Sequence, residues 1–281
     1  MRRRYRILTV GYGLFIAAAP LMALHSSAHA QSAEQVLCDR IAADPADPDK
    51  PGDVSGVLNI QATDIPLALK YCRLASPRSR RAMYELGRTY AANNQMPQAE
   101  SAYRKAAAAG STAAMVALGI LYDGGSGAGK DPAQARALFQ RAATAGNALA
   151  VARLAALDQR AGQSMNPVQE RALLTNAAAA NSADAQFQLG LMYANGVGGP
   201  KDDVAARSLF EKAAAQGNVD ALDWMGSFAA NGRGGPRDVG AAKSYYEKAA
   251  ALGNEDAKAQ LKLLDCSLIM KDSRGHVVGC M

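Results

Sequence analysis

A pattern of about 35 residues recurs along this chain and constrains its fold more than any other feature. One marker is a Leu-Gly pair or a close variant, and successive pairs begin 32, 36, 35 and 36 residues apart. The pairs begin at Leu86, Leu118, Leu154, Leu189 and Met225. A second marker ends each Ala-rich run, at Gly110, Gly146, Asn181, Gly217 and Gly253. Because both markers keep nearly the same step, the sequence predicts five repeats that each pack only on their neighbours.

Each repeat is predicted to be a helix, a turn and a second helix. The first helix carries Ala-x-x-x-Leu-Gly-x-x-Tyr, as in 82–90, and the second carries Ala-x-x-x-Phe/Tyr-x-x-Ala-Ala, as in 206–214. Apolar residues at steps of three and four make one buried stripe on each helix. A mid-helix glycine costs about 0.8–1 kcal/mol relative to alanine, so its recurrence indicates a close helix contact that a side chain would block. The predicted fold class is all-α, an α-solenoid coiled as a right-handed superhelix.

The segments on either side of the repeats are predicted to cap them, because the ends of a solenoid otherwise expose apolar surface. Ser32 begins a capping-box helix, and 65–75 resembles a lone second helix of a repeat. Two apolar runs flank Asp272-Ser-Arg-Gly275 and predict a small C-terminal β-hairpin tail. The predicted division of the chain is a leader over 1–30, capping helices and a linker over 31–81, five repeats over 82–253, and a capping helix with the hairpin over 254–281.

The glycine-rich turn of the fourth repeat is the most specific motif. Gly-Val-Gly-Gly-Pro-Lys-Asp spans 196–202, and Phe210 with Glu-Lys-Ala-Ala-Ala-Gln-Gly follows. This succession closely resembles the Sel1-like repeat, a relative of the tetratricopeptide repeat, and the resemblance covers roughly residues 82–265. The third repeat departs from the pattern, because Ala155 replaces the glycine and Leu174 replaces the aromatic residue.

The resemblance to exported Sel1-like proteins implies a binding function without a cofactor. It points to a scaffold, adaptor or regulator that binds a protein partner in the cell envelope. Two alternatives stay open. One is a hydrolase that acts on cell-wall or β-lactam substrates, and the other is a module that binds envelope polysaccharide. The exported relatives linked to hydrolysis resemble this chain less, because they carry a cysteine pair within each repeat and this chain does not.

The amino-terminal 30 residues have the pattern of a secretory signal. Four arginines lie in the first six positions, an apolar run follows over 7–24, and Ala28-His-Ala30 fits a signal peptidase site. We therefore expect a periplasmic or secreted protein with no membrane span after cleavage, although an uncleaved anchor stays possible. Without 1–30, 27 of the 31 basic residues remain against 25 acidic ones, a net charge of +2. That charge is too weak for nucleic-acid binding.

The four cysteines, Cys38, Cys72, Cys266 and Cys280, all follow the predicted cleavage site. An even count in an oxidising compartment favours disulfides, and three pairings are possible. The pairing closest in sequence is Cys38 with Cys72 and Cys266 with Cys280. No Cys-x-x-Cys spacing is present, so no metal site is predicted. Only His276 would remain as a histidine after cleavage, and we predict no catalytic residue.

The first helices of stacked repeats line an extended surface that such arrays generally use for binding. The residues next to the Leu-Gly pairs are predicted to face this groove, and large aromatic and arginine side chains are typical of interface hot spots. The candidate contact residues are Tyr84, Arg88, Ile120, Arg153, Phe187, Leu191 and Trp224. The alternative for each of them is packing between repeats.

Overall fold

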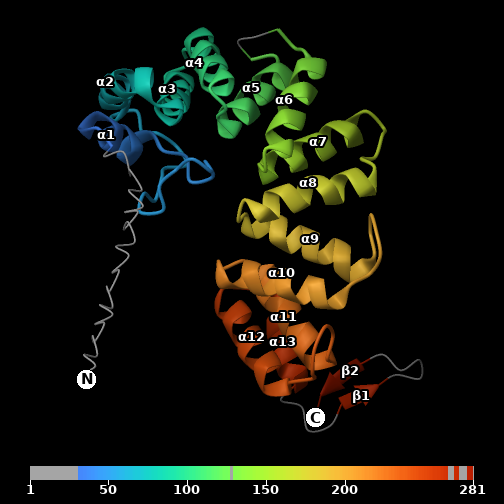
Figure 1. The fold of residues 1–281 in the computed structure, drawn as a ribbon. Helices are drawn as coiled ribbons and strands as arrows, with labels where there is room; N and C mark the ends of the chain where they lie inside the picture. The colour runs from blue at the N-terminus through green and yellow to red at the C-terminus, as the bar shows by residue number, and fades with distance from the viewer. Residues whose placement is uncertain (1–30, 127–128, 265–268, 272–276, 281) are drawn as a thin grey trace, which may run out of the picture. The chain divides into compact units, whose positions relative to one another are not determined.

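The computed structural model describes residues 31–126, 129–264, 269–271 and 277–280 of the 281-residue chain. Its helices follow one another as a row of packed pairs (Figure 1). The elements before the repeats are α1 (Ala33–Ala42), α2 (Ile65–Ala75) and the 3-10 turn η1 (Ser76–Arg78). The repeat helices, each of 13 residues, are α3 (Arg80–Ala92), α4 (Met96–Ala108), α5 (Thr112–Gly124), α6 (Pro132–Thr144), α7 (Ala148–Arg160), α8 (Pro167–Ala179), α9 (Ala183–Asn195), α10 (Asp203–Ala215), α11 (Val219–Asn231) and α12 (Val239–Ala251). The last elements are α13 (Glu255–Leu264), β1 (Ile269–Lys271) and β2 (Val277–Cys280).

The repeat helices pack in sequence order, as the repeat pattern predicts. The two helices of each pair contact each other, and the second helix of each pair contacts the first helix of the next pair. Helices α1 and α2 pack on α3, and α13 packs on α12 and α11. The prediction of an all-helical solenoid is therefore confirmed, with additional helices covering both ends of the array.

At the junctions between repeats, a left-handed residue ends one helix and a capping side chain begins the next. Ser111 and Asn147 cap α5 and α7, because their side-chain oxygens accept hydrogen bonds from the backbone N–H groups of Ala114 and Ala150 at 3.2 and 3.1 Å. The preceding helix ends in a left-handed residue at each junction, and at Asn181 φ is +64°. These two features stop one helix and start the next in every repeat.

The mid-helix glycines make room for the aromatic residue of the paired helix. A Cβ atom at Gly119 would lie 2.5 Å from Cε1 of Phe139, and one at Gly226 would lie 2.6 Å from Cδ1 of Tyr246. Carbon atoms pack best at about 3.5–4.0 Å, so a side chain at either position would collide with the ring. The predicted reason for the recurring glycine is confirmed.

The third repeat changes both members of this pair together. Ala155 stands where the other four repeats have glycine. The paired helix α8 has Leu174 where the other repeats have an aromatic residue. Both side chains line one pocket between α7 and α8. Helices α7 and α8 still contact each other, but far less closely than the helices of the other four pairs, and α8 also packs on α6.

A buried disulfide links α1 to α2. Cys38 and Cys72 have no exposed surface, and their Cα atoms lie 4.9 Å apart. This confirms one of the two predicted pairings. Strands β1 and β2 pair antiparallel, with Ile269 opposite Cys280. Cys266 and residues 272–276 lie outside the described residues, so the second disulfide and the hairpin turn stay predictions.

None of the helices in the described part of the chain is long and apolar enough to cross a membrane.

Candidate functional site

The first-helix surface of repeat 1 is occupied by the linker between α1 and α2. The hydroxyl of Tyr84 donates a hydrogen bond to Oδ2 of Asp44 at 2.6 Å. The guanidinium of Arg88 donates to the backbone oxygens of Ala42, Val57 and Leu58 at 2.8, 2.7 and 2.9 Å. Both side chains thus face the predicted groove, but they bind the chain itself.

Tyr84 is therefore not an open contact residue. Its side chain is only 5% exposed, and burial together with the nearby Asp44 carboxylate raises the pKa of its phenol, which stays a neutral donor. The prediction that Tyr84 is available to a partner is wrong, because the linker covers it. Arg88 binds the linker but also lines an open pocket of ≈ 350 Å³, so its availability to a partner stays a prediction. The sequence between α1 and α2 gave no sign of where the linker packs.

Two further arginines of α3 hold the same linker. Arg80 binds Asp49 through two hydrogen bonds of 2.7 and 2.6 Å. Arg81 binds the backbone oxygen of Asp49 at 2.9 Å and the buried Asp39 at 2.8 and 3.0 Å. Fork-shaped pairs of this kind fix orientation as well as charge, so the linker is anchored to repeat 1 at several points.

A buried carboxyl group lies beside the disulfide. Glu85 has no exposed surface, and its Oε2 lies 2.8 Å from Sγ of Cys38. Burial, and then the charge of Asp39, raise the pKa of Glu85 to about 9, so the carboxyl is protonated at neutral pH. Cys38, Cys72 and Glu85 bring possible metal-ligand atoms within 4.8 Å of one another, but the disulfide leaves no thiolate to bind a cation.

Beyond repeat 1, the groove is open. Ile120 on α5 is 37% exposed, and Arg153 on α7 is exposed. Next to Arg153, Leu149 is 44% exposed and lines a pocket of ≈ 530 Å³ between α7, α8 and α9. The other lining residues are mostly small: Ala148, Val151, Ala152, Ala155, Leu174, Ala185 and Gln188, with Glu170, Asp184 and Ala46 of the linker. This hollow lies where the third repeat lacks an aromatic side chain.

The aromatic residues of repeats 4 and 5 form a shared cluster. Phe187 is 8% exposed, and its ring centroid lies 5.8 Å from that of Phe210. Trp224 is half-buried, with its ring 5.5 Å from Phe210 and 6.1 Å from Phe228. Leu191 is half-buried against the same cluster. The predicted exposure of Phe187 is wrong, because its ring packs against Phe210 of α10. Within this cluster, only Trp224 of the predicted aromatic contact residues reaches the surface.

Trp224 lines a second open pocket, of ≈ 520 Å³, between α11 and α13. Tyr246 of α12 lines it too, and Asp223 and Asp256 contribute carboxylates. Burial, followed by the charges of Asp256 and Asp220, raises the pKa of Asp223. The sequence analysis did not identify these residues as candidates. Asp223 could have been found, because it lies two residues before Met225, just as Tyr84 lies two residues before Leu86.

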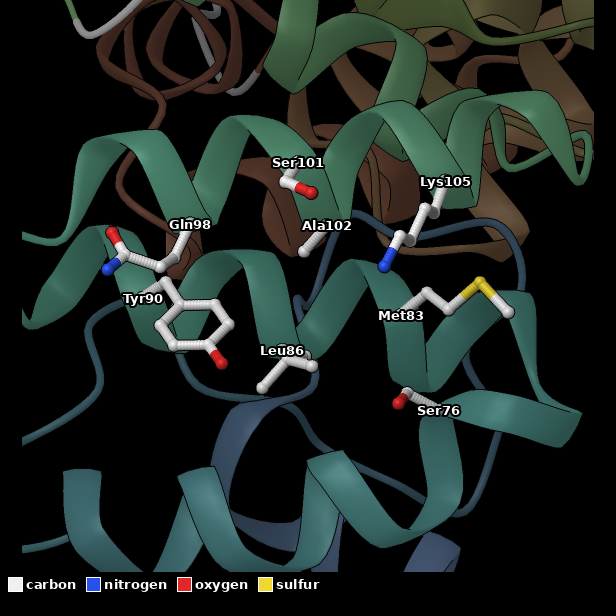
Figure 2. Close-up of a pocket in the computed structure, with 8 residues that line it drawn as sticks. All are labelled: Ser76, Met83, Leu86, Tyr90, Gln98, Ser101, Ala102 and Lys105. Carbon is white, nitrogen blue, oxygen red and sulfur yellow. The ribbon is translucent and has the colours of Figure 1, made fainter.

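A smaller pocket of ≈ 190 Å³ lies between η1, α3 and α4. Figure 2 shows Met83, Leu86 and Tyr90 of α3 facing residues of α4, with Lys105 the one charged side chain among those that line it. Its size suits a single side chain.

Comparisons with known proteins agree with the geometry. The Sel1 repeat pattern matches residues 112–147, 183–218 and 219–254. A Sel1 repeat protein from Oxalobacter formigenes superposes with a TM-score of 0.60 at 29% identity, over 72% of this chain and 60% of that one. A protective antigen of uropathogenic Escherichia coli strains, which displays an SLR fold, superposes with a TM-score of 0.59 at 27% identity, over 70% of this chain and 44% of that one.

This chain thus spans less than two thirds of the length of either structure. Among curated proteins, no sequence matches it. The matched segments coincide with the helix pairs α5–α6, α9–α10 and α11–α12. The chain is therefore a helical solenoid that contains Sel1 repeats.

Proposed function

We propose that this protein is an exported, non-enzymatic scaffold that binds a protein partner on the first-helix surface of repeats 2 to 5. The observation that carries the proposal is the linker on repeat 1. There, the side chains next to the Leu-Gly pair hold backbone and carboxylate oxygens of an irregular segment. The equivalent surface of the later repeats offers open pockets of ≈ 530 and ≈ 520 Å³ for a segment from another chain.

The repeat class supports a binding role, since Sel1 repeat proteins typically mediate protein–protein interaction. The open surface also has the composition of an interface, because Leu149, Ile120 and Trp224 give it apolar anchors and Arg153 gives it a charged one. We propose a right-handed superhelix for the array, and a C-terminal hairpin closed by Cys266 and Cys280.

The proposed location is the cell envelope, either the periplasm or the exterior. The basic and apolar pattern of residues 1–30 supports export. The Cys38–Cys72 disulfide supports an oxidising compartment, because structural disulfides are rare in the cytosol.

Affinity capture of the partner from envelope extracts tests the binding surface. The full-length protein is compared with Leu149→Asp and Arg153→Ala, which change exposed positions and leave the core intact. Val204→Asp on α10 is the matched control, since Val204 is 68% exposed on a second helix. We expect the first two variants to weaken binding at least 10-fold and the control to bind as the unaltered protein does. Equal loss in the control, or no loss in any variant, would refute the proposed surface.

A further inference from the structure

The pocket between α11 and α13 combines an aromatic face with two carboxylates. Trp224 and Tyr246 give it two rings, and Asp223 and Asp256 give it two carboxylates. The remaining lining residues are Ser227, Ala230, Asn231, Gln260, Leu263 and Leu264. None of these lining residues is basic, so the pocket has no cation of its own among them.

Asp223 is half-buried, and one of its two carboxylate oxygens lacks a partner among the residues that the structure describes. Its Oδ1 atom is buried and accepts no hydrogen bond within the described part of the chain. A buried carboxylate oxygen without a partner is destabilising. The neighbouring charges of Asp256 and Asp220 add repulsion, which is why they help to raise the pKa of Asp223. A cation in this pocket would relieve both the missing bond and the repulsion.

Two other carboxylates that are at least half-buried are paired with arginine. Arg81 binds Asp39 at 2.8 Å, and Arg233 binds Asp203 at 2.6 Å. No arginine of the described ranges lines the pocket that holds Asp223 and Asp256.

Arg233 also shows how an arginine fits between a carboxylate and a ring on these repeats. Its guanidinium carbon lies 4.2 Å from the centroid of Phe228 while the group binds Asp203. A guanidinium group stacks on aromatic faces and forks onto carboxylates at the same time, which an ammonium group does less well. The pocket offers the same two kinds of group, with Trp224 in the place of the ring.

We propose that this pocket receives an arginine side chain of the protein partner, stacked against Trp224 and paired with Asp223 and Asp256. This inference rests on the proposed function and names the chemistry that the partner presents at one end of the binding surface. The rest of the surface, from α5 to α9, offers the apolar side chains of Ile120 and Leu149 and the charged side chain of Arg153.

The single tryptophan of the chain reports on the pocket directly. The full-length protein labelled with ¹⁵N gives one indole N–H signal, which is followed by NMR during titration with acetyl-Ala-Arg-Ala-amide. The control peptide carries citrulline, which keeps the shape of arginine and removes its charge. We expect a saturable shift with the arginine peptide and at least 10-fold weaker binding of the citrulline peptide.

Variants assign the effect to the two carboxylates. Asp223→Asn with Asp256→Asn should weaken binding of the arginine peptide at least 10-fold, whereas Asp53→Asn, an exposed linker residue outside the pocket, should not. Asp256→Asn alone serves as a second variant, because Asp256 is exposed and its replacement leaves the fold intact. Equal binding of both peptides, no saturable shift with either, or unchanged binding by the Asp223 and Asp256 variants would overturn the assignment. Partner capture that survives these variants but is lost in Leu149→Asp would overturn the arginine site and leave the proposed function standing.

Discussion

Gly119 provides the sharpest test of how the repeats pack. Replacing it with alanine would place a methyl group 2.5, 2.9 and 3.0 Å from Cε1, Cδ1 and Cζ of Phe139. Contact between carbon atoms is favourable at about 3.5–4.0 Å, so the ring or the helix must move by about 1 Å. Phe139 has no exposed surface and no solvent-facing space to move into.

The expected magnitude follows from two opposing effects. Overpacking of a core typically costs about 1–3 kcal/mol, and alanine in place of a mid-helix glycine contributes about 0.8–1 kcal/mol of stability. We therefore expect Gly119→Ala to lower the free energy of unfolding by about 0–2 kcal/mol, toward the upper end because the nearest contact would be only 2.5 Å. Urea unfolding followed by far-UV circular dichroism measures this change.

The same helix holds a matched control. A methyl group at Gly124 would lie 3.8 Å from its nearest neighbour, Oγ of Ser126. Gly124→Ala makes the same chemical change without a collision, so we expect a change within about 0.5 kcal/mol or a small gain from helix propensity. If Gly119→Ala proves as stable as Gly124→Ala, the glycine is not required for close packing.

The third repeat suggests a rescue. It combines Ala155 with Leu174, so Gly119→Ala together with Phe139→Leu copies a pairing that the chain already contains. We expect the double variant to be at least about 1 kcal/mol more stable than the sum of the two single effects predicts, as found for residues in direct contact. Additive effects would refute the idea that alanine with leucine can replace glycine with phenylalanine at this contact.

The remaining predictions concern the N-terminal cap and the tail. Replacing Cys38 and Cys72 with serine removes a crosslink between residues 34 apart and should cost about 2–4 kcal/mol in urea unfolding; no loss would show that the disulfide does not stabilise the cap. Burial and the charge of Asp39 raise the pKa of Glu85 from near 4.5 to about 9 on folding. Between these pH values the folded protein holds a proton that the unfolded chain has lost, so the free energy of unfolding falls as pH rises. Glu85→Gln should flatten this fall in unfolding curves recorded between these pH values, and an unchanged slope would contradict a protonated Glu85. His276→Ala should leave partner capture and biological function intact, whereas loss of function with unchanged folding and binding would favour the hydrolase alternative.

The sequence predicted the features that depend on neighbouring residues. The period, the capping residues at Ser111 and Asn147, and the glycine that accepts an aromatic ring all follow from local patterns. The Cys38–Cys72 pairing was also accessible, because it was the pairing closest in sequence and joins two helices that pack together.

The exposure of groove residues was harder to predict, because it depends on what packs on them. Tyr84 was predicted to be open to a partner, but residues of the linker cover it. Phe187 is buried because Phe210 lies against it. Asp223 and Asp256 come from α11 and α13, which are separated in the chain by α12, so only the folded chain shows that they share a pocket.

Site-specific photo-crosslinking in cells tests the central claim, that the first helices of the repeats bind the partner. A photoreactive phenylalanine analogue is placed in the full-length protein at Ile120 or Leu149, which are 37% and 44% exposed on first helices. The comparison positions are Val168 and Val204, which are 65% and 68% exposed on second helices. The account predicts one adduct of the same mass from both first-helix positions and none from the second-helix positions. Adducts that form only from Val168 and Val204, or equally from all four positions, would contradict it.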